Sequence, residues 1–247
     1  MTRTSRLRPG GRAESGGSLT EAVMDHVRTS VIDGSMRPGE WYSAYQLAEE
    51  LGISRSPVRE GLLRLEEAGL VEFVRRRGFR IVPTTPEDVA EIFSIRIALE
   101  VPAAERAARA NAPGWAQEAA ALRAAMVAAA ERDEQQLFFE IDQQLHALIL
   151  DAGAMPRSRR LIDQLRTSTR LLGASTAGDK RGYSDIIEEH DPVVSAIRDG
   201  SAAAAGAAMR VHLVTTGVLL VAQALERAGR DEDPGVLWDR LTAGFAG

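Results

Sequence analysis

Two patterns of hydrophobic and polar positions divide the chain near residue 84. The first part shows a short helical pattern at 45–51, a longer one ending at Gly69, and alternating segments at 71–74 and 79–82. A repeat of about 3.6 residues predicts an amphipathic helix, and strict alternation predicts a half-buried strand. The second part has alanine-rich helical patterns without a convincing strand. We therefore predict a mainly α protein, in which a small helix-and-hairpin unit precedes an all-helical bundle.

The helices of the second part have clear start and stop signals. Thr85-Pro86-Glu87-Asp88 offers a hydroxyl cap, a first-turn proline and two acidic residues at the positive end of a helix. Asn111-Ala112-Pro113-Gly114 ends that helix, and Pro102 is expected to kink it. Later helices are predicted over residues 115–132, 134–151, 156–174, 185–199 and 201–228.

The turn between the first two helices carries residues that indicate DNA binding. After the Gly52 turn, Ser54-Arg55-Ser56-Pro57 opens the second helix, and Arg59 lies one turn beyond Arg55. This is the layout of a helix-turn-helix, whose second helix enters the major groove. An arginine can grip guanine or phosphate with two bonds, and hydroxyls at a helix start can bind phosphate. The side chains predicted to contact DNA are Ser54, Arg55, Ser56 and Arg59.

Residues 71–82 are typical of a two-stranded wing with a basic tip. Arg75-Arg76-Arg77-Gly78 joins the two alternating segments and places three arginines where a hairpin turns. Such a tip can reach a minor groove or the DNA backbone, and Arg77 is predicted to make such a contact. The alternative is a surface helix and hairpin whose arginines are only solvated. A basic wing directly after the helix-turn-helix favours a winged helix-turn-helix that binds DNA.

Longer stretches of residues 19–83 match a known DNA-binding domain. The matching pieces are Ile32-x-Gly34-x-Met36-x-Pro38-Gly39-Glu40, Leu47-Ala48-x-x-Leu51 followed by residues 52–62, Leu65-Glu66-x-x-Gly69-Leu70-Val71, and Arg76-Arg77-Gly78-Phe79. On these motifs the segment resembles the winged-helix domain of GntR-type bacterial transcription regulators. The resemblance implies DNA contacts from the helix residues named above and from Gly78. The chain departs from the family at Tyr45, where an arginine is usual.

Charge is divided unequally between the two parts of the chain. The formal net charge is −5, but residues 1–83 hold 13 Lys and Arg against 11 Asp and Glu, a net of +2. Residues 84–247 hold 17 against 24, a net of −7. A basic first part suits contact with DNA phosphates, so the acidity belongs to a second part with a different role.

The composition also limits the class of protein. The chain has 247 residues and no cysteine, which excludes disulfides and thiolate metal sites. Residues 216–224 are the most apolar stretch, and we expect no apolar run long enough to span a bilayer. The N-terminal residues are rich in Gly, Ser and Arg without an apolar signal core. We expect a cytoplasmic protein with no membrane partner and with a disordered basic tail at residues 1–17.

Three of the four histidines lie in the predicted helical bundle. Asp142 precedes His146 by one turn on a helix face that also carries apolar residues, and His190 and His212 lie on two later helices. Three imidazoles and a carboxylate from three helices can form an N3O site for a metal ion. The alternative is three ordinary core histidines, one of them in a hydrogen-bonded pair with Asp142.

The helical part also matches a known domain. The matching pieces are Ile95-Arg96-x-x-Leu99-Glu100 with Ala103-Ala104, Phe139-x-x-Asp142-x-x-x-His146, Glu189-His190, and Ala208-Met209-x-x-His212-Leu213. On these motifs the segment resembles the FCD ligand-binding domain of FadR-type GntR regulators. The resemblance implies that a divalent ion (zinc, nickel or manganese) is held at the base of an effector cavity. Its ligands are then Asp142, His146, His190 and His212.

Four protein ligands leave open positions on an octahedral metal, and these positions suit chelation of a small carboxylate effector. The resemblance implies an additional effector contact from Arg96, and an ion pair with Glu100, one turn on, is the structural alternative. Pro192 follows His190 closely and is expected to shift the start of its helix without moving the imidazole. Two alternative functions remain open. One is a pure metal sensor, in which the ion itself is the signal. The other is a metal-dependent phosphohydrolase, because the dipeptide His190-Asp191 also marks helical enzymes of that type.

The sequence therefore predicts a homodimeric transcription regulator, acting as a repressor on a palindromic double-stranded operator. No pairing beside the histidines supplies a convincing general base, so we do not expect an enzyme. The expected organisation is a tail at 1–17, a DNA-binding domain at 18–83, an effector- and metal-binding domain at 84–228 and a C-terminal tail at 229–247.

Overall fold

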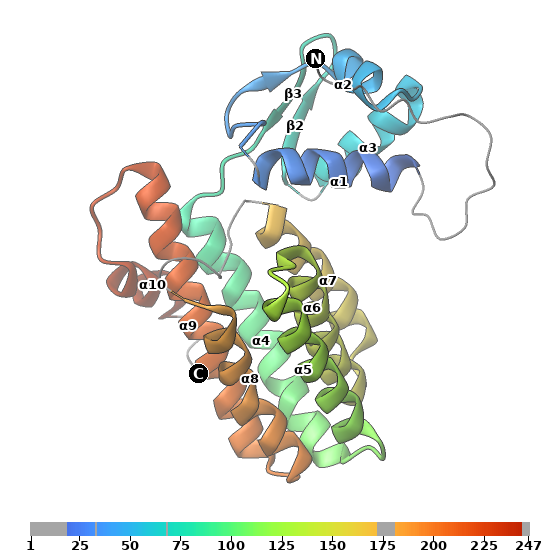
Figure 1. Ribbon diagram of the computed structural model, residues 1–247. Helices are drawn as coiled ribbons and strands as arrows, with labels where there is room; N and C mark the ends of the chain where they lie inside the picture. Colours follow the sequence, from blue (N-terminus) through green and yellow to red (C-terminus); the bar gives the residue numbers. More distant parts are fainter. Residues whose placement is uncertain (1–18, 33, 68, 172–180, 244–247) are drawn as a thin grey trace, which may run out of the picture. The chain divides into compact units, whose positions relative to one another are not determined.

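The computed structural model of the chain describes residues 19–32, 34–67, 69–171 and 181–243 (Figure 1). The chain divides into two structural units, and the boundary between them in the sequence lies between Pro83 and Thr84. The first unit combines helices with a small sheet, and the described residues of the second form helices joined by short connections. The prediction of a mainly α protein with a winged helix-turn-helix and a helical bundle is confirmed.

The described residues of the first unit form three helices and a three-stranded antiparallel sheet. Its elements are α1 (Leu19–Ile32), β1 (Trp41–Tyr42), α2 (Ala44–Leu51), α3 (Arg55–Glu67), β2 (Val71–Val74) and β3 (Gly78–Ile81). The strand order is β1-β3-β2. The predicted hairpin pairs in register, with Phe73 opposite Phe79 and Val74 opposite Gly78. Strand β1 was not predicted, because two residues are too few to show an alternating pattern.

The core of the first unit lies between its helices and the sheet. Val23 on α1, Leu62 on α3 and Phe79 on β3 are fully buried there. Gly78 begins β3 beside β1 with φ at +108°, and a Cβ at that position would collide with the carbonyl oxygen of Tyr42. A side chain at position 78 would therefore disturb the pairing of the wing, which gives this glycine a structural role.

The second unit is a bundle of long helices followed by a short one (Figure 1). Its elements are α4 (Pro86–Ala110), α5 (Trp115–Glu131), α6 (Gln135–Ala152), α7 (Pro156–Leu171), α8 (Tyr183–Arg198), α9 (Ala202–Ala228) and α10 (Pro234–Thr242). Thr85 caps α4 in a reciprocal capping box with Asp88, as the sequence predicted. Helix α8 begins at Tyr183 and continues through Pro192, so the proline lies inside the helix.

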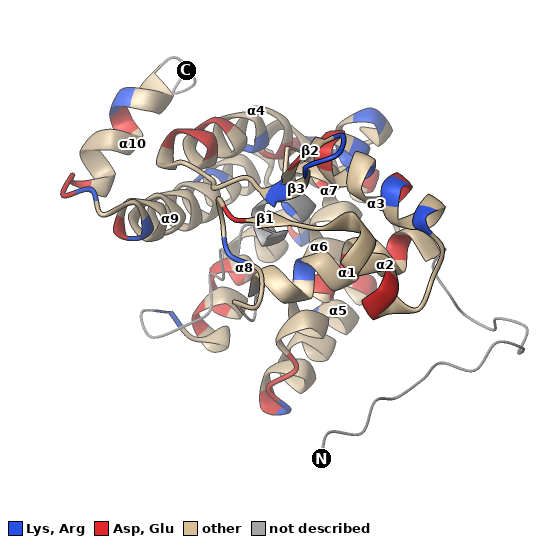
Figure 2. Ribbon diagram, turned by 90° about the horizontal axis from the view of Figure 1, so that it is seen from above, with Lys and Arg blue, Asp and Glu red and all other residues tan. Residues whose placement is uncertain are grey.

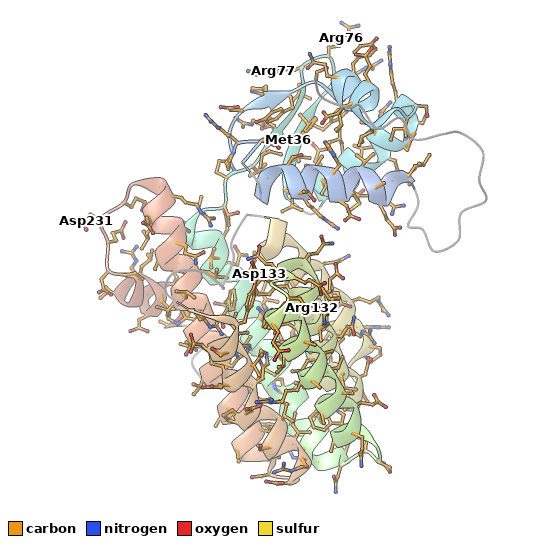
Figure 3. The ribbon with its side chains drawn as sticks, viewed as in Figure 1. Met36, Arg76, Arg77, Arg132, Asp133 and Asp231 are labelled. Carbon is orange, nitrogen blue, oxygen red and sulfur yellow. The ribbon has the colours of Figure 1, made fainter. Side chains whose placement is uncertain are left out.

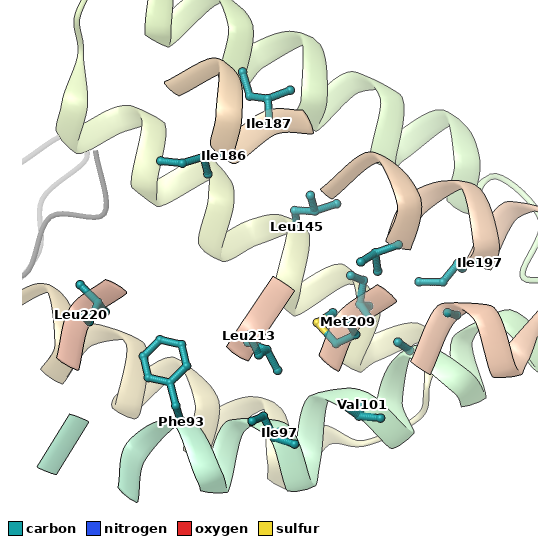
Figure 4. Close-up of a cluster of buried hydrophobic side chains, with 14 of the residues drawn as sticks. Phe93, Ile97, Val101, Leu145, Ile186, Ile187, Ile197, Met209, Leu213 and Leu220 are labelled. Atoms are coloured by element: carbon teal, nitrogen blue, oxygen red, sulfur yellow. The ribbon is translucent and has the colours of Figure 1, made fainter. Parts of the chain in front are cut away.

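The core of the bundle is formed mainly by α4, α6, α8 and α9 (Figure 4). Phe93 on α4, Leu145 on α6 and Leu213 on α9 are each at most 1% exposed. Contrary to the sequence expectation, α9 is long and apolar enough to cross a membrane by length and composition. Half of its most apolar window is buried against α4, α8 and α10, which identifies it as a core helix.

The segment after residue 228 contains an element that the sequence analysis did not anticipate. Helix α10 packs on α4 and α9 and buries Trp238, whose ring lies 6.3 Å from that of Phe93. Gly217 on α9 leaves room for the Trp238 ring, which a Cβ at that position would overlap. Residues 234–242 therefore belong to the folded bundle rather than to a tail. The expected tail at residues 1–17 lies outside the described residues.

Candidate functional site

The residues predicted to contact DNA in the helix-turn-helix lie together on one exposed surface. Gly52 ends α2 in the left-handed conformation, and α3 begins three residues later at Arg55. Val58 and Leu62 are buried on the inner face of α3. The candidate contact residues are exposed on its outer face and first turn: Ser54, Arg55, Ser56 and Arg59. The local fold thus presents two arginines and two hydroxyls to the solvent at the start of one helix.

Tyr45 lies on α2 beside the start of the candidate recognition helix α3. Its ring is half exposed, and the Arg55 guanidinium lies 4.7 Å from the ring centroid. A hydrogen bond to the Glu49 carboxylate raises the pKa of the Tyr45 hydroxyl and holds the ring from the next turn of α2. Tyr45 therefore orients Arg55 by a cation–π contact.

The wing carries the other predicted DNA contacts. Arg75, Arg76 and Arg77 are exposed between β2 and β3, where basic residues gather in Figure 2 and the tip is labelled in Figure 3. The Arg77 guanidinium lies 4.0 Å from the centroid of the Trp41 ring on β1. The unpredicted strand β1 thus supplies an aromatic support for a wing arginine.

The three histidines of the bundle come together from three different helices. His146 on α6, His190 on α8 and His212 on α9 are each at most 5% exposed. Each offers one ligand atom within 4.8 Å of the other two. Among the described residues this is the one group of histidine and acidic side chains with metal-ligand spacing. Asp142 is not in that group, but its Oδ1 lies 3.2 Å from His190 Nε2.

Hydrogen bonds at Nδ1 fix the orientation of all three imidazoles. His146 Nδ1 contacts the Glu100 carboxylate, His190 Nδ1 lies 2.7 Å from the carbonyl oxygen of Ile186, and His212 Nδ1 lies 3.3 Å from Glu189 Oε2. A carbonyl oxygen and an ionised carboxylate accept hydrogen bonds, so these contacts favour the tautomer with the proton on Nδ1. In that tautomer the Nε2 atom carries the lone pair, as in metal-binding histidines.

The donor set fits a divalent cation. His146 Nε2 and His190 Nε2 are 3.2 Å apart, and Asp142 Oδ1 adjoins the second of them. With the protons on Nδ1, these three atoms are all acceptors, so a shared cation satisfies them better than hydrogen bonds among themselves. The separation is also close to the roughly 3.0–3.4 Å between neighbouring ligands that each lie about 2.0–2.1 Å from zinc.

The electrostatic environment of the histidines favours the protonation states that bind a cation. Burial, reinforced by the charge of Arg166, lowers the pKa of His146 to about 4. Burial and the two neighbouring imidazoles likewise lower the pKa of His212. Burial alone would raise the pKa of Asp142, but the charge of the Arg166 guanidinium beside it opposes burial, and the carboxyl stays ionised well below its usual range. Neutral imidazoles beside an ionised carboxylate are the protonation states that metal binding requires.

Arg96 lies in an ion pair inside the bundle. Its Nε donates to Glu100 Oε1 at 2.7 Å, and both side chains are at most 5% exposed. This is the structural alternative considered from the sequence. Arg96 Nη2 has no hydrogen-bond partner among the described residues, so the guanidinium retains a buried donor.

Several residues around the histidines were not identified as functional from the sequence. Glu100 contacts both Arg96 and His146, Arg166 pairs with Asp142, and Arg181 pairs with Glu189. Glu100 could have been found as an acidic residue on the apolar face of α4. The sequence around Arg166 and Arg181 does not reveal their partners, because these pairs depend on tertiary packing.

The arrangement around Asp191 does not favour the phosphohydrolase alternative. Arg123 on α5 donates two hydrogen bonds to the Asp191 carboxylate, at 2.7 and 2.8 Å. Both side chains are more than 40% exposed, unlike the buried histidines. Such an enzyme would use the Asp191 carboxylate as a metal ligand. Here that carboxylate pairs with Arg123 at the surface of the bundle instead.

Comparisons with protein families match both units. The model described as bacterial regulatory proteins, gntR family, matches residues 19–81, and the model described as the FCD domain matches residues 91–215. The two regions fall in the winged unit and the helical bundle, respectively. The four candidate metal ligands all lie within the second region.

Individual relatives and a solved structure agree with these matches. An HTH-type transcriptional regulator from the TAR-I ttuE-ttuC' intergenic region of Agrobacterium vitis is 34% identical over 147 residues, 58% of this chain and 86% of the relative. A probable D-xylose utilization operon transcriptional repressor of Paenarthrobacter nicotinovorans is 26% identical over 196 residues, 79% and 86% of the two chains. Escherichia coli McbR/YncC has the same fold, with a TM-score of 0.69 at 23% identity, over 84% of this chain and 99% of that one.

Proposed function

Because the chain belongs to the GntR family of bacterial transcription regulators and carries an FCD domain, we propose that it is a metabolite-responsive repressor. We propose that it is cytoplasmic and that a small carboxylate, bound at a metal centre, changes its affinity for the operator. The observation that carries the metal centre is the convergence of buried acceptor atoms from α6 and α8, with the imidazole of α9 beside them. A relative named as a transcriptional repressor supports the direction of regulation.

The proposed DNA contacts are of two kinds: contacts with base edges, which give sequence specificity, and contacts with the backbone, which position the protein on the DNA. Arg55 and Arg59 on α3 read base edges in the major groove, and Ser54 and Ser56 bind phosphate at the start of the helix. Arg77 at the wing tip contacts the DNA backbone or a minor groove. Gly78 contributes by allowing the hairpin to lie close to β1.

The proposed effector site lies at the histidines. His146, His190 and His212 hold a divalent ion together with Asp142, and we propose zinc, nickel or manganese as the ion. When bound, the ion supplies a Lewis-acid anchor for a carboxylate group. Arg96 provides a buried donor for the same ligand through its Nη2. Effector binding changes operator affinity through a coupling of typically about 1–3 kcal/mol.

A homodimer on a palindromic operator follows from this way of reading DNA, and it can be tested directly. The full chain, loaded with zinc, is used to select binding sites from random duplex DNA. We expect the selected sequences to contain two inverted copies of one short half-site, because a two-fold dimer presents two equivalent recognition helices. Selection of a single asymmetric site, or no enrichment, would contradict the proposal.

Tyr45 should affect DNA binding through Arg55. We expect Tyr45→Ala to weaken binding to the selected operator by about 2- to 5-fold, since an exposed cation–π contact contributes roughly 0.5–1 kcal/mol. Tyr45→Phe keeps the ring and should bind nearly as well as the wild type. The salt dependence of binding, measured by fluorescence anisotropy, should not change, because neither variant loses a phosphate contact. A large loss in Tyr45→Phe would show that the hydroxyl, rather than the ring, is used.

A further inference from the structure

Among the described residues, three arginine–carboxylate pairs adjoin the histidines, one at each imidazole. Arg96 pairs with Glu100, which contacts His146 Nδ1. Arg166 pairs with Asp142, whose Oδ1 lies 3.2 Å from His190 Nε2.

The third pair is formed by Arg181 and Glu189, whose carboxylate lies 3.3 Å from His212 Nδ1. The three pairs come from α4, from α6 and α7, and from α8 with the residue two positions before it.

The formal charges of these six side chains cancel. Each carboxylate that adjoins a histidine is matched by one arginine, and imidazoles that ligate a metal are neutral. A divalent ion therefore adds two positive charges that no described side chain of this group balances. Uncompensated charge is costly away from water, so the loaded site favours an anionic ligand with a matching charge.

The arginines also keep donors that a ligand can use. Their side chains are 9% exposed or less, yet one nitrogen of each has no hydrogen-bond partner among the described residues. These atoms are Arg96 Nη2, Arg166 Nε and Arg181 Nε. A buried guanidinium N–H is costly to leave unpaired, and a carboxylate is its preferred acceptor. Three such donors, on arginines whose partner carboxylates each adjoin a histidine, suit a ligand with more than one carboxylate.

We propose that the effector is a dianion, a short dicarboxylate that neutralises the divalent ion and accepts hydrogen bonds from Arg181 as well as from Arg96 and Arg166. This inference rests on the proposed metal centre and narrows its ligand from carboxylates in general to dicarboxylates. Arg181 is thereby a specificity-determining residue. A sugar acid or a simple hydroxy acid with one carboxylate leaves one positive charge unmatched.

The test compares ligands that differ by a single charge. Metal-stripped full-length protein is reloaded with zinc at pH 8, and its zinc content is measured first. Calorimetry then compares malonate, succinate and malate with their own monoamides, which have the same chain length. We expect at least one dianion to bind about tenfold or more tightly than its monoamide, because charge-assisted hydrogen bonds are gained. If no dianion binds more tightly than its monoamide, the proposal is overturned.

Substitutions at Arg181, with Arg198 as a control, test whether Arg181 binds the second carboxylate of the dianion. Arg181→Gln is compared at a zinc content matched to the wild type. It should then lower the affinity for the preferred dianion by about tenfold and affect the monoamide less. Arg181→Lys keeps the charge and should retain part of the preference. Arg198→Gln is the matched control, because Arg198 is exposed on α8 and pairs with Asp199. An unchanged preference in Arg181→Gln would remove Arg181 from the proposal.

Failure of the metal centre can be distinguished from failure of the dianion inference. If the stripped protein takes up no zinc, the proposed effector site is wrong and the dianion inference falls with it. If zinc binds at the histidines but dianions and monoamides bind alike, only the inference about charge is overturned. Retained DNA binding in either case leaves the assignment of the winged unit intact.

Discussion

Replacing Arg55 or Arg59 with alanine is expected to weaken binding to the selected operator by roughly 1–3 kcal/mol each, about 5- to 150-fold, without unfolding the protein. Both side chains are exposed at the start of α3, so their loss leaves no cavity in the core. A bidentate contact with a base edge accounts for a cost of this size. Titration by gel shift at a fixed salt concentration measures it.

The same helix provides a control for this prediction. Arg64 is exposed on α3 but pairs with Glu60, so Arg64→Ala should bind nearly as well as the wild type. Changes at Arg75, Arg76 or Arg77 should weaken binding to all sequences alike, with a shallower salt dependence, because phosphate contacts carry no sequence information. Near-wild-type binding by both Arg55→Ala and Arg59→Ala would remove α3 as the recognition helix.

Loss of any one of His146, His190 or His212 is expected to remove most of the bound metal. Wild-type protein should carry about one divalent ion per chain, held in an N3O site. Changes to residues that only support metal ligands typically cost about 10- to 100-fold in affinity, and loss of a ligand should cost at least as much. Elemental analysis after dialysis measures the metal content. Each variant should also melt at a lower temperature in zinc, because an ion bound only to the folded state stabilises it.

His26 is the control for the metal prediction, since it is the one histidine outside the bundle. It lies 3.4 Å from Glu50 in the first unit, so His26→Ala should retain the metal content of the wild type. All three bundle variants should still bind DNA at low temperature but lose their response to the effector. Three variants with unrelated phenotypes and unchanged metal content would mark the histidines as ordinary core residues.

The helices were predictable because their signals are local. Thr85 and Asp88 specify the start of α4, and the Asn111 region specifies its end, whatever the rest of the chain does. Strand β1 and helix α10 were not predicted for a different reason. Trp41–Tyr42 is too short for an alternating pattern, and Trp238 is buried only because Gly217 on α9 leaves space for its ring.

The same distinction applies to the candidate site. Asp142 and His146 lie one turn apart, so a shared helix face could be read directly from their spacing. The arginines that balance the carboxylates could not be found in this way. Arg166 reaches Asp142 from 24 residues away on another helix, and this pairing depends on how α6 and α7 pack. The resemblance to a known domain indicated the metal ligands but carried no information about Arg181.

The melting temperature of metal-stripped protein during a zinc titration tests the metal centre most directly. Acceptor atoms of His146, His190 and Asp142 converge in a buried site, with the His212 imidazole beside them, so zinc should bind the folded state and stabilise it. We expect the melting temperature to rise and to level off at about one equivalent of zinc per chain. A melting temperature that does not respond to zinc, nickel or manganese would contradict the account.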